Sequence, residues 1–395
     1  MLPLDGVTVL DLTRVLSGPY CTMLLGDMGA RVIKVEQPGK GDDTRAWGPP
    51  FLDGESAYFL SINRNKESVT IDFKQPAGRD LLGRLIARSD VLVENFRPGT
   101  LARLGLDYAS LSREHERLVY CSISGFGQTG PRSGEPGYDA VIQGEGGLMS
   151  ITGSADGPPY RLGVAISDIV SGMFAAYGVS MALHARARTG RGQLVDIGML
   201  DAVAALLTYQ AGSYFANGAV PGRLGNRHPS IVPYETFAAS DGDFVLAVGN
   251  DALWQKFCAV TGLDRMDGIE RFATNRQRVT GYDELRPILA ERLATRPRAH
   301  WIERLTEAGV PCGSVRAVDE VLRDPQIGAR EMVALVEHQT IGAMKVLGVP
   351  VKLSSTPGGV RVAPPRLGQH TDAVLRNDLG LDPSAVARLR DARVI

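Results

Sequence analysis

Asp168 stands where a carboxylate could take part in covalent chemistry. It follows an apolar run at residues 163–166, which we expect to be a strand, and it opens a long apolar segment of helical composition. A carboxylate in the first turn of a helix is stabilised by the helix dipole by about 0.3–1 kcal/mol, so a purely structural role would suffice. In a dry pocket the dipole and the exposed amides would keep the group ionised, and an ionised carboxylate can attack an acyl carbon. The residues alone favour neither role.

Two further pairs of residues have both a structural and a chemical interpretation. Tyr138 and Asp139 follow a loop rich in Gly and Pro, where they could be a core aromatic and a capping acid at the start of a helix. Gly249 and Asn250 lie between a predicted hairpin strand and a helix. That position suits ordinary turn chemistry, and it also suits backbone donors for an oxyanion.

Basic residues gather near the ends of predicted strands, where α/β sheets bind ligands. Arginine binds phosphates and carboxylates through paired hydrogen bonds, so this pattern favours an anionic ligand. The turn R-V-L-S-G-P from residue 14 lacks the G-x-G-x-x-G fingerprint, which argues against a nicotinamide dinucleotide. Ser17 in this turn could cap a helix or contact a ligand. The basic cluster comprises Lys34, Lys40, Arg45, Arg64, Lys66, Lys74, Arg97 and Arg103.

Composition and termini argue against several classes of protein. A net charge of −1, from 43 Lys and Arg against 44 Asp and Glu, is not that of a general nucleic-acid binder. Four cysteines without a CxxC pair and six histidines without HExxH spacing argue against a disulfide framework and a metal site. They fit a reducing compartment. The N-terminus lacks a basic signal region, and the most apolar stretch, residues 173–183, is shorter than the roughly 20 residues that span a bilayer. We therefore expect a cytoplasmic protein without a membrane partner.

The elements that must position these residues alternate between strand and helix. Strands are predicted at residues 7–12, 31–35, 68–73, 91–94 and 118–123, with helices at 20–28 and 77–88. This alternation indicates a doubly wound α/β domain with a parallel sheet. An irregular, Gly-rich stretch from residue 211 leads to a predicted hairpin and helices, and the pattern changes again near residue 324. We expect residues 1–210 and 325–395 to form one large domain, and residues 211–324 to form a linker and a smaller inserted domain.

Several long motifs, in order, resemble one family. They are DLTRVLSGPYCTMLLGDMGARVIKVEQPGKGDDTR, NRNKESVTIDF, VENFRPGTLARLGL, YCSISGFGQTGP, PGYDAVIQ, SDIVSGMFA and TGRGQLVDIGMLDA. Over nearly its whole length the chain resembles the family III CoA-transferases of the CaiB/BaiF type. The resemblance implies a Rossmann-like large domain built from both chain ends, a smaller inserted α+β domain and an interlocked homodimer.

The resemblance also implies an activity and a set of site residues. Asp168 would be the nucleophile that attacks a donor acyl-CoA, passes through a mixed anhydride to an aspartyl-CoA thioester, and yields CoA to an acceptor acid. Coenzyme A is then a co-substrate, and no tightly bound cofactor is expected. The CoA-contacting positions would be Arg14, Ser17, Ile71, Asp72, Phe73, Lys74, Asn95, Phe96, Arg97 and Arg103. The substrate pocket would involve Arg45, Trp47, Tyr58, Tyr138, Asp139, Gly249 and Asn250.

Within the family, GDDTRAWGPPF and HPSIVPYETF look most like the branch that uses succinyl-CoA with dicarboxylic acids such as glutarate. Leu16 stands where the formyl-CoA/oxalate branch has Gln, and the glycine run of that branch is absent near Gly249. Both departures weigh against oxalate. A free distal carboxylate needs a cation, for which the candidates are Arg45, Arg161 and Arg227.

Two rival functions remain open from the sequence. An α-methylacyl-CoA racemase of this fold has a His where this chain has Tyr138, and tyrosine, with a reference pKa of about 10, is a poor base near neutral pH. A non-catalytic CoA-binding subunit is the second rival. The presence of Asp168 weighs against it.

Overall fold

A six-stranded sheet forms the centre of the first of two units into which the chain divides. The computed structural model describes all 395 residues. The strands follow the order β5-β2-β1-β6-β7-β8, and every neighbouring pair is parallel. The predicted α/β class with a parallel sheet is therefore confirmed. The strands are β1 (Thr8–Asp11), β2 (Arg31–Glu36), β5 (Lys66–Thr70), β6 (Val91–Glu94), β7 (Val119–Ser124) and β8 (Leu194–Gly198).

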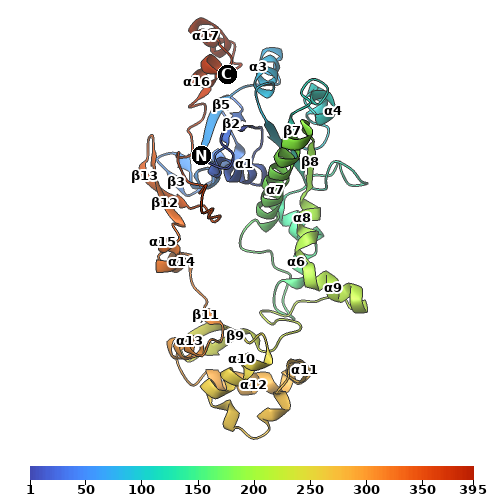
Figure 1. The fold of residues 1–395 in the computed structure, drawn as a ribbon, viewed down its shortest axis with the longest axis vertical. Coiled ribbons are helices and arrows are strands. Elements are labelled where there is room, and N and C mark those ends of the chain that lie inside the picture. Colours follow the sequence, from blue (N-terminus) through green and yellow to red (C-terminus); the bar gives the residue numbers. More distant parts are fainter. The chain divides into compact units, whose positions relative to one another are not determined.

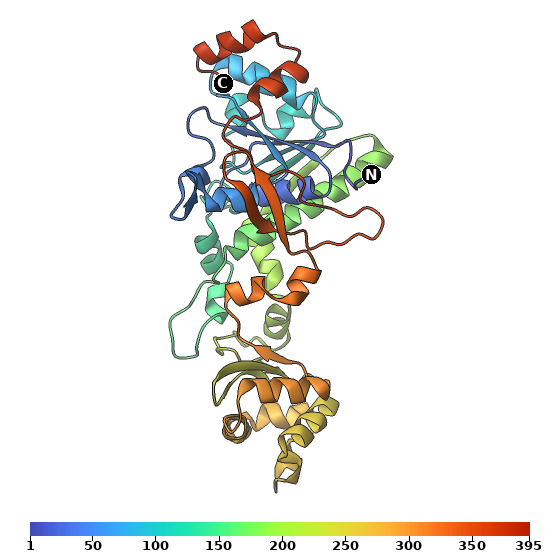
Figure 2. The ribbon, with the colours of Figure 1, turned by 90° about the vertical axis from the view of Figure 1, so that its left-hand side faces the viewer.

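Alternate residues of these strands enter two separate hydrophobic cores, one on each face of the sheet. Val9 and Val32 pack in the core that contains α1 (Ser17–Asp27) and α7 (Ile166–Thr189). Leu10 and Ile33 pack in the core that contains α3 (Pro76–Ile86). The pattern follows from the period of two in a strand, which sends successive side chains to opposite faces. Figure 2 shows the helices on both sides of the sheet.

The C-terminal segment completes the α3 face of the sheet. Helices α16 (Thr371–Asn377) and α17 (Pro383–Asp391) contribute buried residues such as Leu375 to the same core as α3. The backbone N–H of Asp72 donates to the carbonyl of Val394 at 2.7 Å, which ties the end of the chain to the loop after β5. The C-terminus lies beside α3 in Figure 1. This first unit comprises Met1–Leu148, Arg161–Gly212 and Asp324–Ile395.

The strand order reverses between β1 and β6, because the chain builds outward from β1 through β2 to β5 and then returns to β6 on the other side. Loops that leave the carboxyl ends of adjacent strands diverge at such a point and leave a crevice for a ligand. Here they are the turn after β1, at residues 12–16, and the loop after β6, from residue 95. The fold therefore brings together two segments that lie about eighty residues apart in the sequence.

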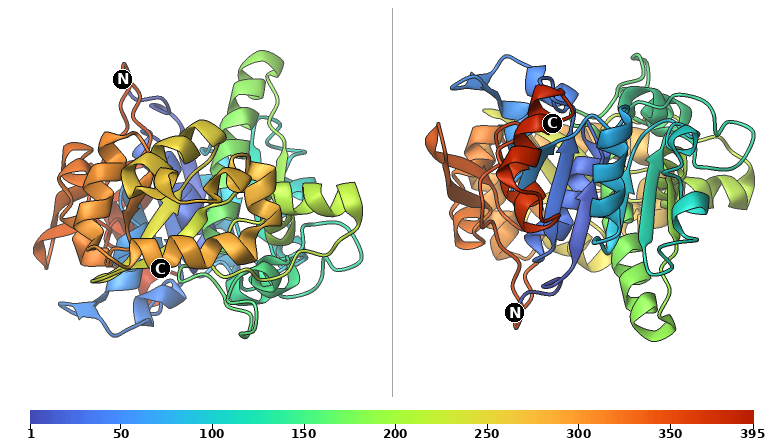
Figure 3. Two further views of the ribbon diagram at one scale, coloured as in Figure 1. Left: turned by 90° about the horizontal axis from the view of Figure 1, so that it is seen from below. Right: turned by 90° about the horizontal axis from the view of Figure 1, so that it is seen from above.

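The second unit comprises Met149–Tyr160 and Ser213–Arg323 and has its own core. A three-stranded antiparallel sheet orders β11 (Cys312–Ser314), β10 (Gly242–Ala247) and β9 (Tyr234–Ala239). Figure 3 shows its helices in yellow and orange. They are α10 (Asp251–Thr261), α11 (Asn275–Thr280), α12 (Tyr282–Leu293), α13 (Arg298–Glu307) and α14 (Val318–Leu322). The predicted hairpin forms between β9 and β10, and Gly262 and Gly309 end helices at φ of 74°.

The remaining elements are short pieces around the two units. The β12–β13 hairpin packs against α2 through Leu60, Val336 and Met344. A two-stranded ribbon of β3 and β4 precedes α2. The bounds are α2 (Ala57–Ile62), α4 (Tyr108–Leu111), α5 (Asp139–Glu145), α6 (Leu148–Ile151), α8 (Met199–Leu206), α9 (Thr208–Asn217), α15 (Pro325–Ala329), β3 (Phe51–Leu52), β4 (Glu55–Ser56), β12 (Val333–His338) and β13 (Gly342–Leu347).

Three local predictions differ from the structure. No strand forms at residues 163–166, because that run is exposed and unpaired, and α7 already begins at Ile166. The first helix begins at Ser17 rather than at residue 20, with Leu16 in the N-cap position, so Ser17 is not the cap residue. The strand predicted at residues 68–73 is β5 and begins at Lys66, since it pairs with β2 from that residue onward.

Helix α7 is apolar on nearly all sides, a composition typical of a fully buried helix, but it is not fully buried. Its small residues do pack closely, but Met173 is 52% exposed and Tyr177 is 64% exposed. The helix is also longer than the apolar stretch counted in the sequence, and by length and composition alone it could cross a membrane. It lies in the core formed with α1 and the sheet, which is the packing of an ordinary core helix. One such helix is therefore weak support for a membrane span.

Candidate active site

Asp168 lines a cavity of about 220 Å³ at the point where the strand order reverses. The turn after β1, the loop after β6 and the end of β7 form its walls. The carboxylate is thus not sealed inside the protein, which any reaction at Asp168 requires. The other predicted site residues that line this cavity are Arg14, Ser17, Asn95, Phe96, Arg97 and Tyr138.

Asp139 caps the helix that carries Asp168. Residue Ala165 precedes α7 and offers no side-chain cap, so the first amides of the helix need an external acceptor. The Ser167 N–H donates to Asp139 Oδ1 at 2.9 Å, and the Ser167 hydroxyl donates to the Asp139 carbonyl at 3.3 Å. The sequence indicated a capping acid at the start of α5. The structure shows that its carboxylate caps α7 instead, which brings a second negative charge near Asp168.

The pKa of Asp168 is raised from 3.8 to about 7, mainly by burial and in addition by the negative charge of Asp139. A hydrogen bond from the Ser17 hydroxyl lowers it. The sequence-based expectation that the helix dipole would keep this carboxylate fully ionised is therefore wrong, because loss of hydration outweighs the dipole in this pocket. Near neutral pH the group exists in both forms, so an ionised nucleophile and a protonated acid are both available.

Tyr58 lies close enough to both carboxylates to respond to their charge. Burial raises the pKa of its hydroxyl to about 12, with further contributions from Asp168 and Asp139. The phenol therefore stays protonated and can donate a hydrogen bond. Its ring meets Trp47 edge to face, with centroids 5.2 Å apart, and the two residues line a separate shallow pocket with Gly48, Pro49 and Pro50.

Ser17 can approach Asp168 because α1 and α7 touch at a glycine. Gly172 lies one helical turn after Asp168, and a Cβ atom built there would stand 2.6 Å from the Ser17 carbonyl oxygen. Any side chain at residue 172 would push the two helices apart. The small residues of α7 thus permit its close packing against α1.

Tyr138 is 68% exposed and precedes α5 as its N-cap residue, so the interpretation as a core aromatic is wrong. Its ring borders the cavity of Asp168 instead. The preceding glycine allows this path, because Gly137 and Gly125 meet backbone to backbone and a Cβ on Gly137 would stand 2.4 Å from the Gly125 Cα.

A second cavity of about 230 Å³ adjoins the first and shares Arg14 and Phe96 with it. The guanidinium of Arg14 lies 5.5 Å from the Phe96 ring centroid, and Phe73 meets Phe96 edge to face at 6.2 Å. The two cavities could hold a long ligand with chemically different ends. The predicted CoA positions Ile71, Asp72, Phe73 and Lys74 all line the second cavity, whereas Arg103 lines neither.

Several predicted residues are not among the lining of either cavity. Arg45 pairs with Glu36 through two hydrogen bonds of 2.7 and 2.8 Å and stacks 3.6 Å from the Phe59 ring, so its charge is already engaged. Arg161 is exposed and donates to the Leu162 carbonyl. Three predicted residues, Arg227, Gly249 and Asn250, belong to the second unit. The Asn250 side chain accepts from the Leu253 N–H at 2.9 Å, which is ordinary helix capping.

Sequence reasoning missed how the turn after β1 is held. Val15 has a φ of 69°, a backbone region that β-branched residues almost never occupy. No propensity or motif marks Val15, because its conformation depends on side chains that come from elsewhere in the chain. The small residues of α7 suit close packing, but residue order does not show that Gly172 is the point of contact with α1.

Comparison with known proteins identifies the family. The model of CoA-transferase family III matches residues 4–371. The chain belongs to CoA-transferase family III. Its sequence is 43% identical to the succinyl-CoA:glutarate CoA-transferase of Mus musculus, over 100% of this chain and 91% of that protein. It is 42% identical to the acetyl-CoA:oxalate CoA-transferase of Acetobacter aceti, over 89% of each chain. A crystal structure of a CaiB/BaiF family protein from Brucella suis has 42% identity and a TM-score of 0.84, covering 95% of this chain and 99% of that one.

The family assignment agrees with the resemblance found in the motifs, so the protein is a CoA-transferase. Such an enzyme exchanges CoA thioesters, and a site in which the Asp168 carboxylate lines one of two adjoining cavities is compatible with that chemistry. No group of three or more His, Cys, Asp or Glu side chains is arranged to hold a metal ion.

Replacing Gly172 by Ala should separate α1 from α7 and weaken the contact between Ser17 and Asp168. Overpacking of this kind costs about 1–3 kcal/mol of stability, and a small misplacement of reacting groups can lower the rate by up to about a hundredfold. Steady-state kinetics and urea denaturation measure the two effects. Gly212→Ala is the control, because a Cβ there meets nothing within 4 Å. Normal activity in Gly172→Ala would contradict the role given to this contact.

Asp168→Asn should stabilise the protein increasingly as the pH rises. The folded-state pKa of Asp168 is raised from 3.8 to about 7, so between these values the unfolded chain loses this proton first. Stability therefore falls as the pH rises through that window, and asparagine removes the penalty. Urea denaturation of both proteins at pH 5 and pH 8 should show a larger difference at pH 8. The exposed Asp267→Asn serves as control. An equal difference at both pH values would mean that burial does not shift Asp168.

Proposed function

We propose that this enzyme moves CoA from succinyl-CoA to a dicarboxylic acid such as glutarate, through a covalent intermediate on Asp168. The observation that carries the proposal is the position of Asp168, which is reachable from a cavity at the strand-order reversal and carries a pKa of about 7. The mouse relative named for these two substrates supports the choice of donor and acceptor.

The chemistry balances without any other reactant. The ionised Asp168 carboxylate attacks the thioester carbonyl of the donor, CoA leaves as a thiolate, and a mixed anhydride forms. The thiolate attacks the Asp168 carbonyl of that anhydride, which releases the donor acid as a carboxylate and leaves an aspartyl-CoA thioester. The acceptor carboxylate then displaces the thiolate, and the thiolate attacks the acceptor carbonyl to regenerate Asp168. One thioester is exchanged for another, so no external energy source is needed, and covalent catalysis divides the exchange into easier steps.

The surrounding residues have roles that follow from their chemistry. The Ser17 hydroxyl lowers the pKa of Asp168 and so favours the ionised form that attacks. The protonated hydroxyl of Tyr58 can donate to oxygen atoms that gain negative charge during the reaction. The second cavity, with Lys74 and Arg14 in its lining, suits the nucleotide end of CoA because its phosphates are anionic.

The choice of acceptor acid depends on the cations near Asp168. Relatives named for glutarate and for oxalate are about equally similar to this chain. The cations that line the cavity of Asp168 are Arg14 and Arg97, and the Arg97 guanidinium donates to the Gly134 carbonyl at 3.3 Å. A distal carboxylate that reaches Arg97 would distinguish a longer dicarboxylate from oxalate, whose two carboxyl groups are directly bonded.

The racemase alternative has less support. Removal and return of an α-proton needs two acid–base groups. No histidine lines the cavity of Asp168, and the raised pKa of Tyr58 makes this phenol a poor base. The alternative of a non-catalytic CoA-binding subunit loses support from the accessibility of Asp168.

A panel of acceptors tests the function. Incubation with succinyl-CoA should transfer CoA to glutarate faster than to oxalate, malate, mesaconate, itaconate or citramalate, as followed by chromatography of the acyl-CoA products.

Asp168→Ala should lose at least a thousandfold in kcat and still bind CoA, because nucleophile removal abolishes the covalent route. Mass spectrometry of wild-type protein mixed with succinyl-CoA should show a CoA adduct on Asp168 that hydroxylamine removes. The exposed Asp267→Asn is the matched control. Normal turnover by Asp168→Ala would overturn the mechanism.

We also propose an interlocked homodimer, in which residues 211–324 form the smaller inserted domain of each chain. The support is the side of α7 that the fold leaves uncovered. Met173, Tyr177 and Met181 lie at intervals of four residues and are 52%, 64% and 48% exposed. Apolar stripes of this kind mark interaction surfaces.

Tyr177→Asp should weaken the dimer, because it places a charge within that apolar stripe. Sedimentation velocity should give about twice the 42.4 kDa chain mass for the wild type and a larger monomer fraction for the variant. A charged substitution at an exposed position of the second unit, Val318→Asp, is the control. A wild-type protein that sediments as a monomer would contradict the proposal.

A further inference from the structure

The turn after β1 is held in a strained conformation. Val15 has a φ of 69°, which costs a β-branched residue on the order of 1–3 kcal/mol and persists only when the surroundings enforce it. Strain of this kind concentrates where a protein must place a group accurately. Two residues after Val15 comes Ser17, which lines the same cavity as Asp168 and whose hydroxyl lowers the pKa of that carboxylate. The conformation of Val15 therefore decides where Ser17 begins α1.

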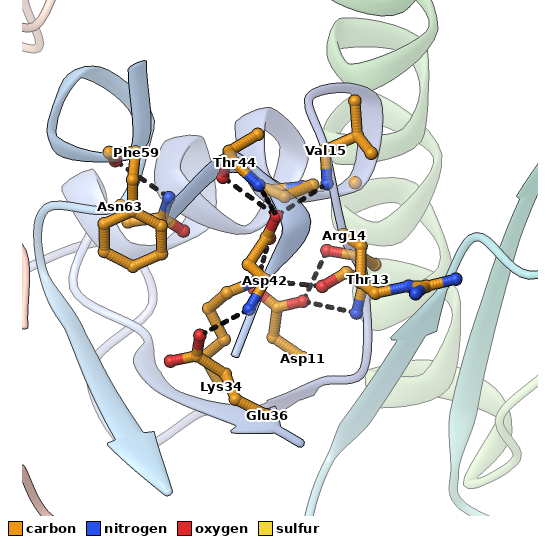
Figure 4. Close-up of polar contacts among 12 residues, drawn as sticks. Asp11, Thr13, Arg14, Val15, Lys34, Glu36, Asp42, Thr44, Phe59 and Asn63 are labelled. Atoms are coloured by element: carbon orange, nitrogen blue, oxygen red, sulfur yellow. Dashed lines mark hydrogen bonds and ion pairs between the residues drawn. The ribbon is translucent and has the colours of Figure 1, made fainter. Parts of the chain in front are cut away.

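A buried carboxylate holds the strained residue. Asp42 Oδ1 accepts a hydrogen bond from the Val15 N–H at 3.1 Å, and it also accepts from the Thr44 N–H and hydroxyl at 3.0 and 2.8 Å. The Asp42 side chain is fully buried. The bond to Val15 spans 27 residues of sequence and has no counterpart in regular secondary structure. Figure 4 shows Asp42 between Val15, Thr44 and Lys34.

Lys34 contacts the other side of the same turn. Its Nζ lies 2.9 Å from Asp42 Oδ2 and donates to the Thr13 carbonyl at 2.8 Å. The ion pair thus holds the N–H of Val15 through its carboxylate and the C=O of Thr13 through its ammonium group. Both side chains are completely buried, where isolated charges would be very costly. Burial alone would lower the pKa of Lys34, but the negative charges of Asp42, Asp11 and Glu36 raise it above its usual value. The ammonium group therefore stays charged.

Arg14, which lies between these two contacts, is fixed from the loop after β6. The Asn95 side chain accepts from the Arg14 N–H at 2.9 Å and donates to the Arg14 carbonyl at 2.7 Å. Side chains therefore satisfy the carbonyl of Thr13, both backbone groups of Arg14 and the N–H of Val15. A turn held at four successive backbone groups has little freedom to move.

We propose that Asp42, paired with Lys34, is a positioning residue for the transfer reaction: it holds the turn at Val15 so that Ser17 presents its hydroxyl to Asp168. Neither Asp42 nor Lys34 lines the cavity of Asp168, so their effect on that carboxylate passes through the turn. Asp42 does border the second cavity, where it could also influence CoA binding. The inference rests on the function proposed above.

The test removes both charges together, since removal of one would leave the other buried and unpaired. In Lys34→Met/Asp42→Ala, kcat should fall about tenfold to a hundredfold, while KM for succinyl-CoA changes less than kcat. The pKa of Asp168, measured from its carboxyl carbon by NMR, should rise because the hydrogen bond from Ser17 is lost. Ser17→Ala should raise the same pKa. Combining the two changes should raise it no further than Ser17→Ala does, because both act through one contact.

A second variant tests the strain directly. Glycine adopts positive φ without penalty, so Val15→Gly added to the double variant should recover part of the lost kcat. The matched control is Asp27→Ala/Arg64→Met, which removes another buried ion pair of 2.7 Å that does not touch the turn. The control should lower stability and leave the pKa of Asp168 unchanged. If both charge-removal variants move this pKa equally, or if neither moves it, the inference is wrong.

The outcomes separate this inference from the proposed function. The NMR measurement reports the contact between Ser17 and Asp168 whether or not Asp168 is the nucleophile. Normal turnover in Asp168→Ala would overturn the proposed function alone. An inactive Asp168→Ala together with an unshifted pKa in Lys34→Met/Asp42→Ala would overturn the positioning role alone. A change confined to KM for succinyl-CoA would assign Asp42 to the second cavity and also overturn the positioning role.

Discussion

The close contact between the first turn of α1 and α7 is the constraint on which the site depends. Gly172 leaves room for the Ser17 backbone, and Asp168, one helical turn earlier, lines the same cavity as Ser17. Hydrogen bonding to the carboxylate opposes the loss of hydration that raises its pKa, so the balance of the two sets how much of Asp168 is ionised near neutral pH. The reactivity of one side chain is therefore controlled by how closely two helices pack.

Buried charges surround this contact. Lys34 with Asp42 and Lys66 with Asp11 are ion pairs whose side chains are completely buried, directly beneath the turn after β1. Such pairs add little net stability, because the cost of removing two ions from water offsets much of their attraction. Instead, these ion pairs hold nearby backbone groups in place. Each ion also bonds to a backbone group, as Lys34 does to the Thr13 carbonyl and Lys66 to the Pro19 carbonyl, and these contacts fix the start of α1.

Much of the fold could be predicted because it depends on local pattern. The buried runs of β1, β2, β6 and β7 are continuous and β-branched, and the alternation with helices indicated a parallel sheet. The errors lie where tertiary context decides. Residues 163–166 are apolar but find no strand to pair with, and α7 is apolar on a side that the chain itself does not cover. Hydrophobicity alone does not distinguish these cases from a buried element.

The sequence by itself determined the family, the class of fold and the choice of Asp168 as the candidate nucleophile. Long motifs and hydrophobic periodicity depend only on the order of the residues. Only the tertiary structure decided the ionisation of Asp168, the capping of α7 by Asp139 and the conformation of Val15. Each of these depends on distances between residues that lie tens of positions apart. Hydration and electrostatic attraction act through space, so they take their values only once the chain has folded.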